Sequence, residues 1–301
     1  MSLKDARKKL INKKLGIFEY FGVAFDVFGG LLKEKTVIMI SVFVFMLFYA
    51  VIETIGVVLE KSLNYYQING MEINETTVLL FEIINILSLG TSIILFFITA
   101  YFFRKIALAI EEKENDPKLM KFFVKTLIIF LILNAAVFII NNMAESVIGE
   151  IFLILFFIVI ISISIWGLWY YEAYYIRNFG ILESFNYSLE LSDGNRLRKF
   201  FSGLIFSIGV LVFILITTKI FDILNIKNLT VIIIIAFVFL SAIVLVVMYG
   251  QILNIVIFLN VEYDYLGKNL NEELEFENDN KLGEDNQVLN TFLSNSKNDE
   301  K

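Results

Sequence analysis

The chain contains no cysteine and no histidine, and its 301 residues include a single proline, Pro117. The absence of cysteine and histidine excludes thiolate nucleophiles, disulfides, imidazole general bases, and zinc or haem sites that depend on those ligands. Charged residues are also scarce, at 19% of the sequence. The remaining residues contain no phosphate-binding loop, nucleophile motif or metal-ligand spacing. We therefore expect no catalytic site, no metal site and no cofactor.

Hydrophobic residues are abundant instead, at 58% of the chain, and the mean hydropathy is +0.75. They lie in six continuous runs of about the 20 residues that a helix needs to cross a bilayer core. The runs lie near 36–59, 78–103, 122–141, 147–170, 200–222 and 230–257. Because the runs lack the alternation of a membrane β-barrel, the sequence predicts an all-α polytopic membrane protein with six transmembrane helices.

The basic residues predict the orientation of these spans. Of the 25 lysines and arginines, 21 lie in residues 1–35, 104–121, 171–199 and 260–301, whereas the alternate loops hold only Lys61 and Lys227. Basic loops remain on the cytoplasmic side. We therefore expect a multi-pass protein of the cell membrane with both termini in the cytoplasm. The aromatic run 166–175 (WGLWYYEAYY) is predicted to lie at the membrane interface on the same side.

Two segments of the sequence resemble each other. Residues 16–30 (GIFEYFGVAFDVFGG) align without a gap with residues 180–194 (GILESFNYSLELSDG), and each copy precedes a basic patch and two apolar runs. This pattern predicts a parallel internal repeat. In both copies the apolar residues fall on one helical face, and neither copy is long enough to cross a membrane. We expect two amphipathic helices at the cytoplasmic membrane surface, in contact with anionic lipid headgroups.

The second copy carries a motif that consists of Glu183, Ser184, Phe185, Ser188, Leu191 and Gly194. It resembles the pattern E-A-[LIF]-x-x-S-x-x-L-x-x-G of bacterial and archaeal six-helix membrane proteins. That group includes YciC-like proteins and the membrane domain fused to some glycerophosphodiester phosphodiesterases. The resemblance implies a six-helix fold over about residues 15–260, with Glu183, Ser188 and Gly194 as its interfacial motif. It implies little about function, because most members of the group are uncharacterised.

Charged residues inside membrane spans commonly mark functional sites. Four candidates are expected in the outer half of the membrane or at its boundary: Glu53, Glu82, Glu150 and Lys219. One hypothesis is that they line an outward-facing cavity for a cation or a lipid headgroup, with Glu53 as the deepest member. The alternative is that Glu53 pairs with a neighbouring helix while the other three lie at the interface.

The two ends of the chain differ from the membrane segment, residues 36–261. Residues 1–35 are basic and contain the first amphipathic helix, and anionic lipid explains their charge better than nucleic acid does. Residues 262–301 carry eleven acidic residues and four lysines, a net charge of −7. We predict that this tail is a mostly disordered cytoplasmic extension and a candidate protein-binding segment.

Three functions fit these features. The first is a non-enzymatic membrane protein with a scaffold, lipid-organising or accessory role, which fits the interfacial helices and the acidic tail. The second is a small transporter or permease with a polar site around Glu53, although the near absence of proline disfavours broken-helix transporter designs. The third is an intramembrane lipid-modifying enzyme, for which the sequence offers no set of catalytic residues.

Overall fold

The computed structural model describes residues 2–69, 74–113, 119–143, 168–224 and 229–296. Within these ranges the chain forms nine helices and no strand. The helices are α1 (Leu3–Asn12), α2 (Ile17–Glu34), α3 (Thr36–Ile68), α4 (Glu75–Ile110), α5 (Leu119–Met143), α7 (Tyr170–Ile176), α8 (Ile181–Ser192), α9 (Arg196–Leu224) and α10 (Leu229–Ser296). The described part of the chain is therefore all-helical, as predicted.

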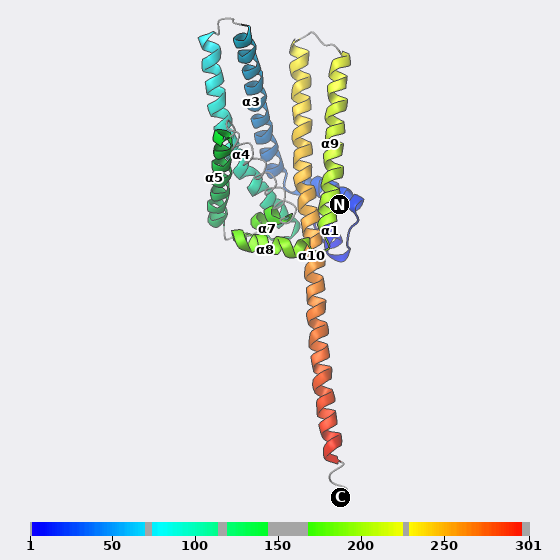
Figure 1. Cartoon of the computed structure of the whole chain (residues 1–301). Coiled ribbons are helices and arrows are strands. Elements are labelled where there is room, and N and C mark those ends of the chain that lie inside the picture. The colour runs from blue at the N-terminus through cyan, green and yellow to red at the C-terminus, as the bar shows by residue number, and fades with distance from the viewer. Residues whose placement is uncertain (1, 70–73, 114–118, 144–167, 225–228, 297–301) are drawn as a thin grey trace.

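Two helical hairpins, α3–α4 and α9–α10, stand side by side and point in the same direction (Figure 1). The short helices α1, α7 and α8 lie at the end of the bundle opposite to the end at which α3 and α9 finish. We call this end, with α1, α2, α7 and α8, the basal end. Helix α10 is central to it, because α10 packs against α1, α2, α3, α4, α8 and α9.

Four described helical segments are long and apolar enough to cross a membrane: Thr36–Ile68, Glu75–Ile110, Arg196–Lys219 and Val231–Gly267. They contain the predicted spans near 36–59 and 78–103, and nearly all of those near 200–222 and 230–257. The predicted span 122–141 lies within α5, a helix of 25 residues that is not among the four segments. The predicted span 147–170 lies almost entirely outside the described residues. This arrangement is that of a helical multi-pass membrane protein.

Several helices extend beyond their apolar runs. Helix α3 continues through residues 60–68, and α10 continues to Ser296, where we expected a disordered tail. Neither extension contains a proline, so no residue there lacks the backbone N–H group that a helix requires. Helical hydrogen bonding can therefore continue from the apolar segment into the polar one, and in α10 the helix differs from the predicted disordered tail.

The core lies at the basal end, where α1, α2 and α7 meet the hairpins, and it includes buried Tyr20, Phe102 and Phe258. Away from this end, other parts of the protein cover little of the spans. In the most apolar 18-residue stretch of the four spans, taken in chain order, only 22%, 6%, 6% and 11% of the residues are buried within the protein. Such extensive exposed apolar surface is unfavourable in water but suits a hydrocarbon environment.

Helices α2 and α8 begin with the same local structure. The Gly16 N–H donates to Glu19 Oε2 at 2.8 Å, and the Gly180 N–H donates to Glu183 Oε2 at 3.0 Å. Each glutamate thus satisfies a backbone donor that the start of a helix leaves unpaired. The aligned glycine and glutamate positions of the two sequence copies therefore have the same structural role.

The two helices also leave apolar side chains exposed. Phe18 and Phe25 on α2 are 78% and 70% exposed, and Leu182 on α8 is 78% exposed. The opposite side of α8 is buried through Ser184 and Ser188. The small serine side chains allow α8 to pack closely against its neighbours, while bulky apolar residues project away from the protein.

Candidate functional site

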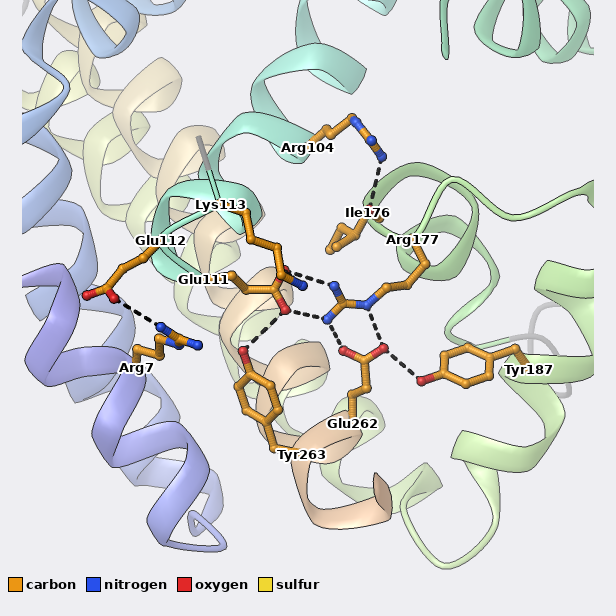
Figure 2. Close-up of polar contacts among 10 residues, drawn as sticks. All are labelled: Arg7, Arg104, Glu111, Glu112, Lys113, Ile176, Arg177, Tyr187, Glu262 and Tyr263. Carbon is orange, nitrogen blue, oxygen red and sulfur yellow. Dashed lines mark hydrogen bonds and ion pairs between the residues drawn. The ribbon is translucent and has the colours of Figure 1, made fainter. Parts of the chain in front are cut away.

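An ion network at the basal end joins three segments through Arg177, which follows the last residue of α7. Its Nη1 and Nη2 atoms donate to the Glu111 carboxylate at 2.9 and 2.6 Å, while Nε donates to Glu262 Oε1 at 2.6 Å (Figure 2). Nη2 also contacts Glu262 Oε2. The side chains of Glu111 and Glu262 are only 4% and 2% exposed, and that of Arg177 is 17% exposed. One guanidinium therefore bridges two buried carboxylates.

Further donors complete the coordination of these carboxylates. The Tyr187 hydroxyl on α8 donates to Glu262 at 2.7 Å, and the Tyr263 hydroxyl on α10 donates to Glu111 at 3.2 Å. The Lys113 ammonium lies 3.3 Å from Glu111. Two carboxylates thus face two cationic side chains, which balances the charge of this network (Figure 2). Buried ion pairs are tolerated only when the remaining polar atoms are satisfied in this way.

The pKa values respond to this environment. Burial alone would raise the pKa of Glu111, but the Arg177 guanidinium beside it holds that pKa below its ordinary value. Burial raises the pKa of the Tyr187 hydroxyl, and the negative charge of Glu262 raises it further. At neutral pH Glu111 therefore remains ionised and Tyr187 protonated. These are the states in which Glu111 accepts from Arg177 and the Tyr187 hydroxyl donates to Glu262. The lowered pKa makes the Glu111 carboxylate a poor proton acceptor, which fits a structural role for the network.

The short helix α7 is held by cations from other helices. Arg104 of α4 donates to the carbonyls of Tyr175 and Ile176 at 2.8 and 3.0 Å. Lys125 of α5 donates to the Tyr174 carbonyl at 3.1 Å. Cations at the carboxyl end of a helix satisfy its unpaired carbonyls and interact favourably with its dipole.

The aromatic run 166–175, which is predicted to lie at the membrane interface, is described from residue 168, and several of its rings are buried within the protein. Trp169, Tyr174 and Tyr175 are almost completely buried, and the Trp169 ring lies against that of Phe258 at 6.1 Å. Tyr171 is 39% exposed. These rings pack within the core because α7 folds back under the hairpins, a tertiary arrangement that an aromatic-rich sequence does not reveal.

Asn260 fixes α10 to the connection between α1 and α2. Its Nδ2 atom donates to the carbonyls of Leu10 and Lys13 at 2.7 and 2.8 Å. Its Oδ1 atom accepts from the Leu15 N–H at 3.1 Å and from the Tyr20 hydroxyl at 2.9 Å. A single buried amide on α10 thereby satisfies four polar groups of the amino-terminal segment.

The predicted polar site in the outer half of the membrane is only partly described. Glu53 on α3 accepts a hydrogen bond from the Ser88 hydroxyl on α4, a contact within one hairpin. Glu82 on α4 and Lys219 on α9 are exposed side chains in separate hairpins, and Glu150 lies outside the described residues. No group of three acidic residues suited to hold a metal ion occurs in the described part of the chain.

The three residues of the predicted interfacial motif each occupy a position that shapes α8. Glu183 caps its start, as described above. The Ser188 hydroxyl accepts from the backbone N–H of Trp169 at 2.9 Å, which ties α8 to the start of α7. Gly194 has a φ of +68°, a left-handed conformation that glycine adopts without strain after a helix ends.

Sequence reasoning missed the Arg177 network because its members are far apart in the chain. Arg177 lies 66 positions from Glu111 and 85 from Glu262, so no local spacing connects them. The one available signal was that each is a charged residue next to the end of an apolar run. Only the packing of α4, α7 and α10 brings them together.

The fold and the network thus define an all-helical membrane protein whose charged groups at one end hold its helices together. Comparisons with protein-family models, curated proteins and solved structures find no match to this chain. The resemblance of the Glu183–Gly194 motif to six-helix membrane proteins accordingly stays a prediction.

Proposed function

We propose that the protein is a non-enzymatic membrane scaffold or accessory protein that presents an acidic helical arm to a basic protein partner at the cytoplasmic face. The arm is the last part of α10, residues 268–296. The observation that carries this proposal is the attachment of α10 immediately before the arm. Glu262 joins the Arg177 network, and Asn260 binds the connection between α1 and α2.

Two further ion pairs support a fixed base for the arm. Asp264 lies 3.3 Å from the Arg198 guanidinium of α9 and 3.4 Å from the Lys14 ammonium. Three alternate positions on α10, Asn260, Glu262 and Asp264, therefore contact different parts of the basal end. A helix held on several sides at its base projects in a defined direction, which favours a presenting role.

The length and charge of the arm fit contact with a partner outside the bilayer. Figure 1 shows α10 extending past the basal end and away from both hairpins. At 1.5 Å per residue, 29 helical residues span about 44 Å. Residues 268–296 contain seven acidic residues and two lysines. A protein surface rich in lysine and arginine is the complementary partner, since opposite charge accelerates association and selects against acidic surfaces.

We also propose the six-span topology with both termini cytoplasmic. The excess of basic residues in alternate loops supports the orientation. Helix α5, with 25 residues, supports a third span, while the fourth rests on the sequence alone. The equivalent caps at Gly16 and Gly180, each followed by a long helical hairpin, support the internal repeat.

The scaffold proposal is tested by site-specific cross-linking in cells that express the full chain. A photoreactive residue at positions along 270–290 should yield one discrete cross-linked protein. The same residue at Leu211 of α9, an exposed apolar position in a span, should not yield it. A variant with the seven arm acids replaced by asparagine or glutamine keeps the arm length, and it should lose the adduct.

Equal cross-linking in the neutralised variant would contradict an electrostatic arm, and the absence of any arm-specific adduct would contradict the presenting role. A chain that ends at residue 267 is the matched control for expression. It retains Asn260, Glu262 and Asp264, so it should fold and reach the membrane to the same extent as the full chain.

A further inference from the structure

A second feature of the basal end lies apart from the arm. A cavity of about 520 Å³ opens between α1, the end of α2, the start of α3 and the end of α4. Its volume falls within the range of small-molecule sites in proteins, about 300–1,000 Å³. Four lysines line it: Lys4, Lys35, Lys105 and Lys113. Lys113 already pairs with Glu111, so Lys4, Lys35 and Lys105 supply the positive charge that the cavity offers to a ligand.

The carboxylates in the cavity wall offset only part of this charge, because three lysines face one carboxylate that has no cationic partner outside the wall. Glu34 and Glu112 line the cavity as well, but Glu112 pairs at 3.0 Å with Arg7, which is not part of the wall. Glu34 accepts a hydrogen bond from the Leu3 N–H at 3.3 Å. Among the described residues, Lys4 and Lys35 form no ion pair.

Apolar side chains lie between the lysines in the cavity wall. Ile38 and Met39 come from the first turn of α3, and Ile106 and Ala109 come from the last turns of α4. Tyr101 lies one turn further into α4, and the Lys105 ammonium lies 5.5 Å from the centre of its ring. These residues belong to the ends of two candidate spans, the part of a span that we expect near the lipid headgroups.

We propose that this cavity binds one anionic phospholipid, with the phosphate among the lysines and the start of an acyl chain along Ile38, Met39 and Tyr101. Lysine ammonium groups bind phosphate as point charges. A free phosphate would contact only the lysines, whereas a phospholipid would also contact the apolar residues of the wall. The inference does not depend on the arm, because the cavity is built from α1 to α4.

The test uses native mass spectrometry of the full chain in a neutral detergent, titrated with dioleoylphosphatidylglycerol or dioleoylphosphatidylcholine. The unaltered chain should bind its first phosphatidylglycerol more tightly than phosphatidylcholine. Replacing Lys4, Lys35 and Lys105 together with glutamine should weaken that first binding step. Each basic residue near anionic lipid contributes on the order of a fivefold change in affinity, so three give about a hundredfold.

The matched control removes three other lysines of the same region, Lys8, Lys9 and Lys33. These side chains are exposed and do not line the cavity, so their replacement by glutamine leaves the net charge equal to that of the first variant. The first phosphatidylglycerol should then bind with nearly unchanged affinity. Equal losses in the two triple variants would show that general surface charge attracts the lipid, and they would overturn the site.

A second variant tests the apolar residues of the cavity wall without changing any charge. Ala109→Phe places a bulky side chain in the cavity without removing any of the four lysines. It should therefore weaken phosphatidylglycerol binding. Competition separates the two sources of phosphate: millimolar inorganic phosphate should leave the bound lipid in place. Displacement of the lipid by inorganic phosphate, or unchanged lipid binding in Ala109→Phe, would refute a phospholipid site. Neither measurement involves the arm. A negative result for the phospholipid site would therefore leave the scaffold proposal intact.

Discussion

Replacing Arg177 with methionine should destabilise the protein strongly, because it leaves two buried carboxylates without their shared cation. Glu111 would retain Lys113 and Tyr263, and Glu262 would retain only the Tyr187 hydroxyl. Removing one partner from a buried ion pair costs about 3–5 kcal/mol. We expect a loss of this size in the free energy of unfolding at neutral pH.

The measurement is equilibrium unfolding of the full chain by dodecyl sulfate in mixed micelles, followed by circular dichroism and tryptophan fluorescence. Trp169 is completely buried against Phe258, whose ring also lies beside Arg177, so in a Trp166→Phe background its emission is a local reporter. Arg7→Met is the matched control, because the Arg7–Glu112 pair is exposed, with side chains 34% and 44% accessible. Surface pairs contribute at most about 1 kcal/mol.

A rescue variant separates the loss of charge balance from the loss of packing. Adding Glu111→Gln and Glu262→Gln to Arg177→Met removes the unpaired negative charge while nearly preserving side-chain shape, and it should recover most of the lost stability. If Arg177→Met were no more harmful than Arg7→Met, or if the glutamines gave no recovery, the network would not hold the basal end together as we argue.

Three further outcomes follow from the contacts. Asn260→Leu should cost at least about 2 kcal/mol, because it leaves four polar groups unpaired, and limited trypsin digestion should then cut faster at Lys13. Gly250→Val should cost about 1–3 kcal/mol in the same unfolding assay, because a Cβ atom there would lie 2.7 Å from the Phe206 ring. The control is Gly209→Val, which should cost far less because a Cβ atom at that position meets nothing within 4 Å. The pKa of Glu111 lies below its ordinary 4.5, so its contribution is fully present above pH 4.5 and lost as the pH falls through the lower folded-state value. Unfolding midpoints measured from about pH 6 to about pH 3 should therefore fall less steeply for Glu111→Gln than for the unaltered chain; parallel curves would contradict this.

The sequence by itself determined the helical class and the four long apolar helices. Continuous apolar runs need no partner to be recognised, because backbone groups in lipid must be satisfied within the same segment. It also indicated the two short helices α2 and α8, since the apolar residues of 16–30 and 180–194 fall on one helical face. Both properties depend on neighbouring residues, so they can be recognised directly in the chain.

Only the tertiary structure decided which charged residues matter to one another. Glu53 stood out in the sequence because it interrupts an apolar run, yet in the described structure it contacts Ser88 within its own hairpin. Glu111, Arg177 and Glu262 were unremarkable in the sequence, and packing joins them. The energy of an ion pair depends on distance and burial in space, and neither follows from separation along the chain. For the same reason the lysine-lined cavity and the fixed base of the arm emerge only when α1 to α4 and α10 have come together.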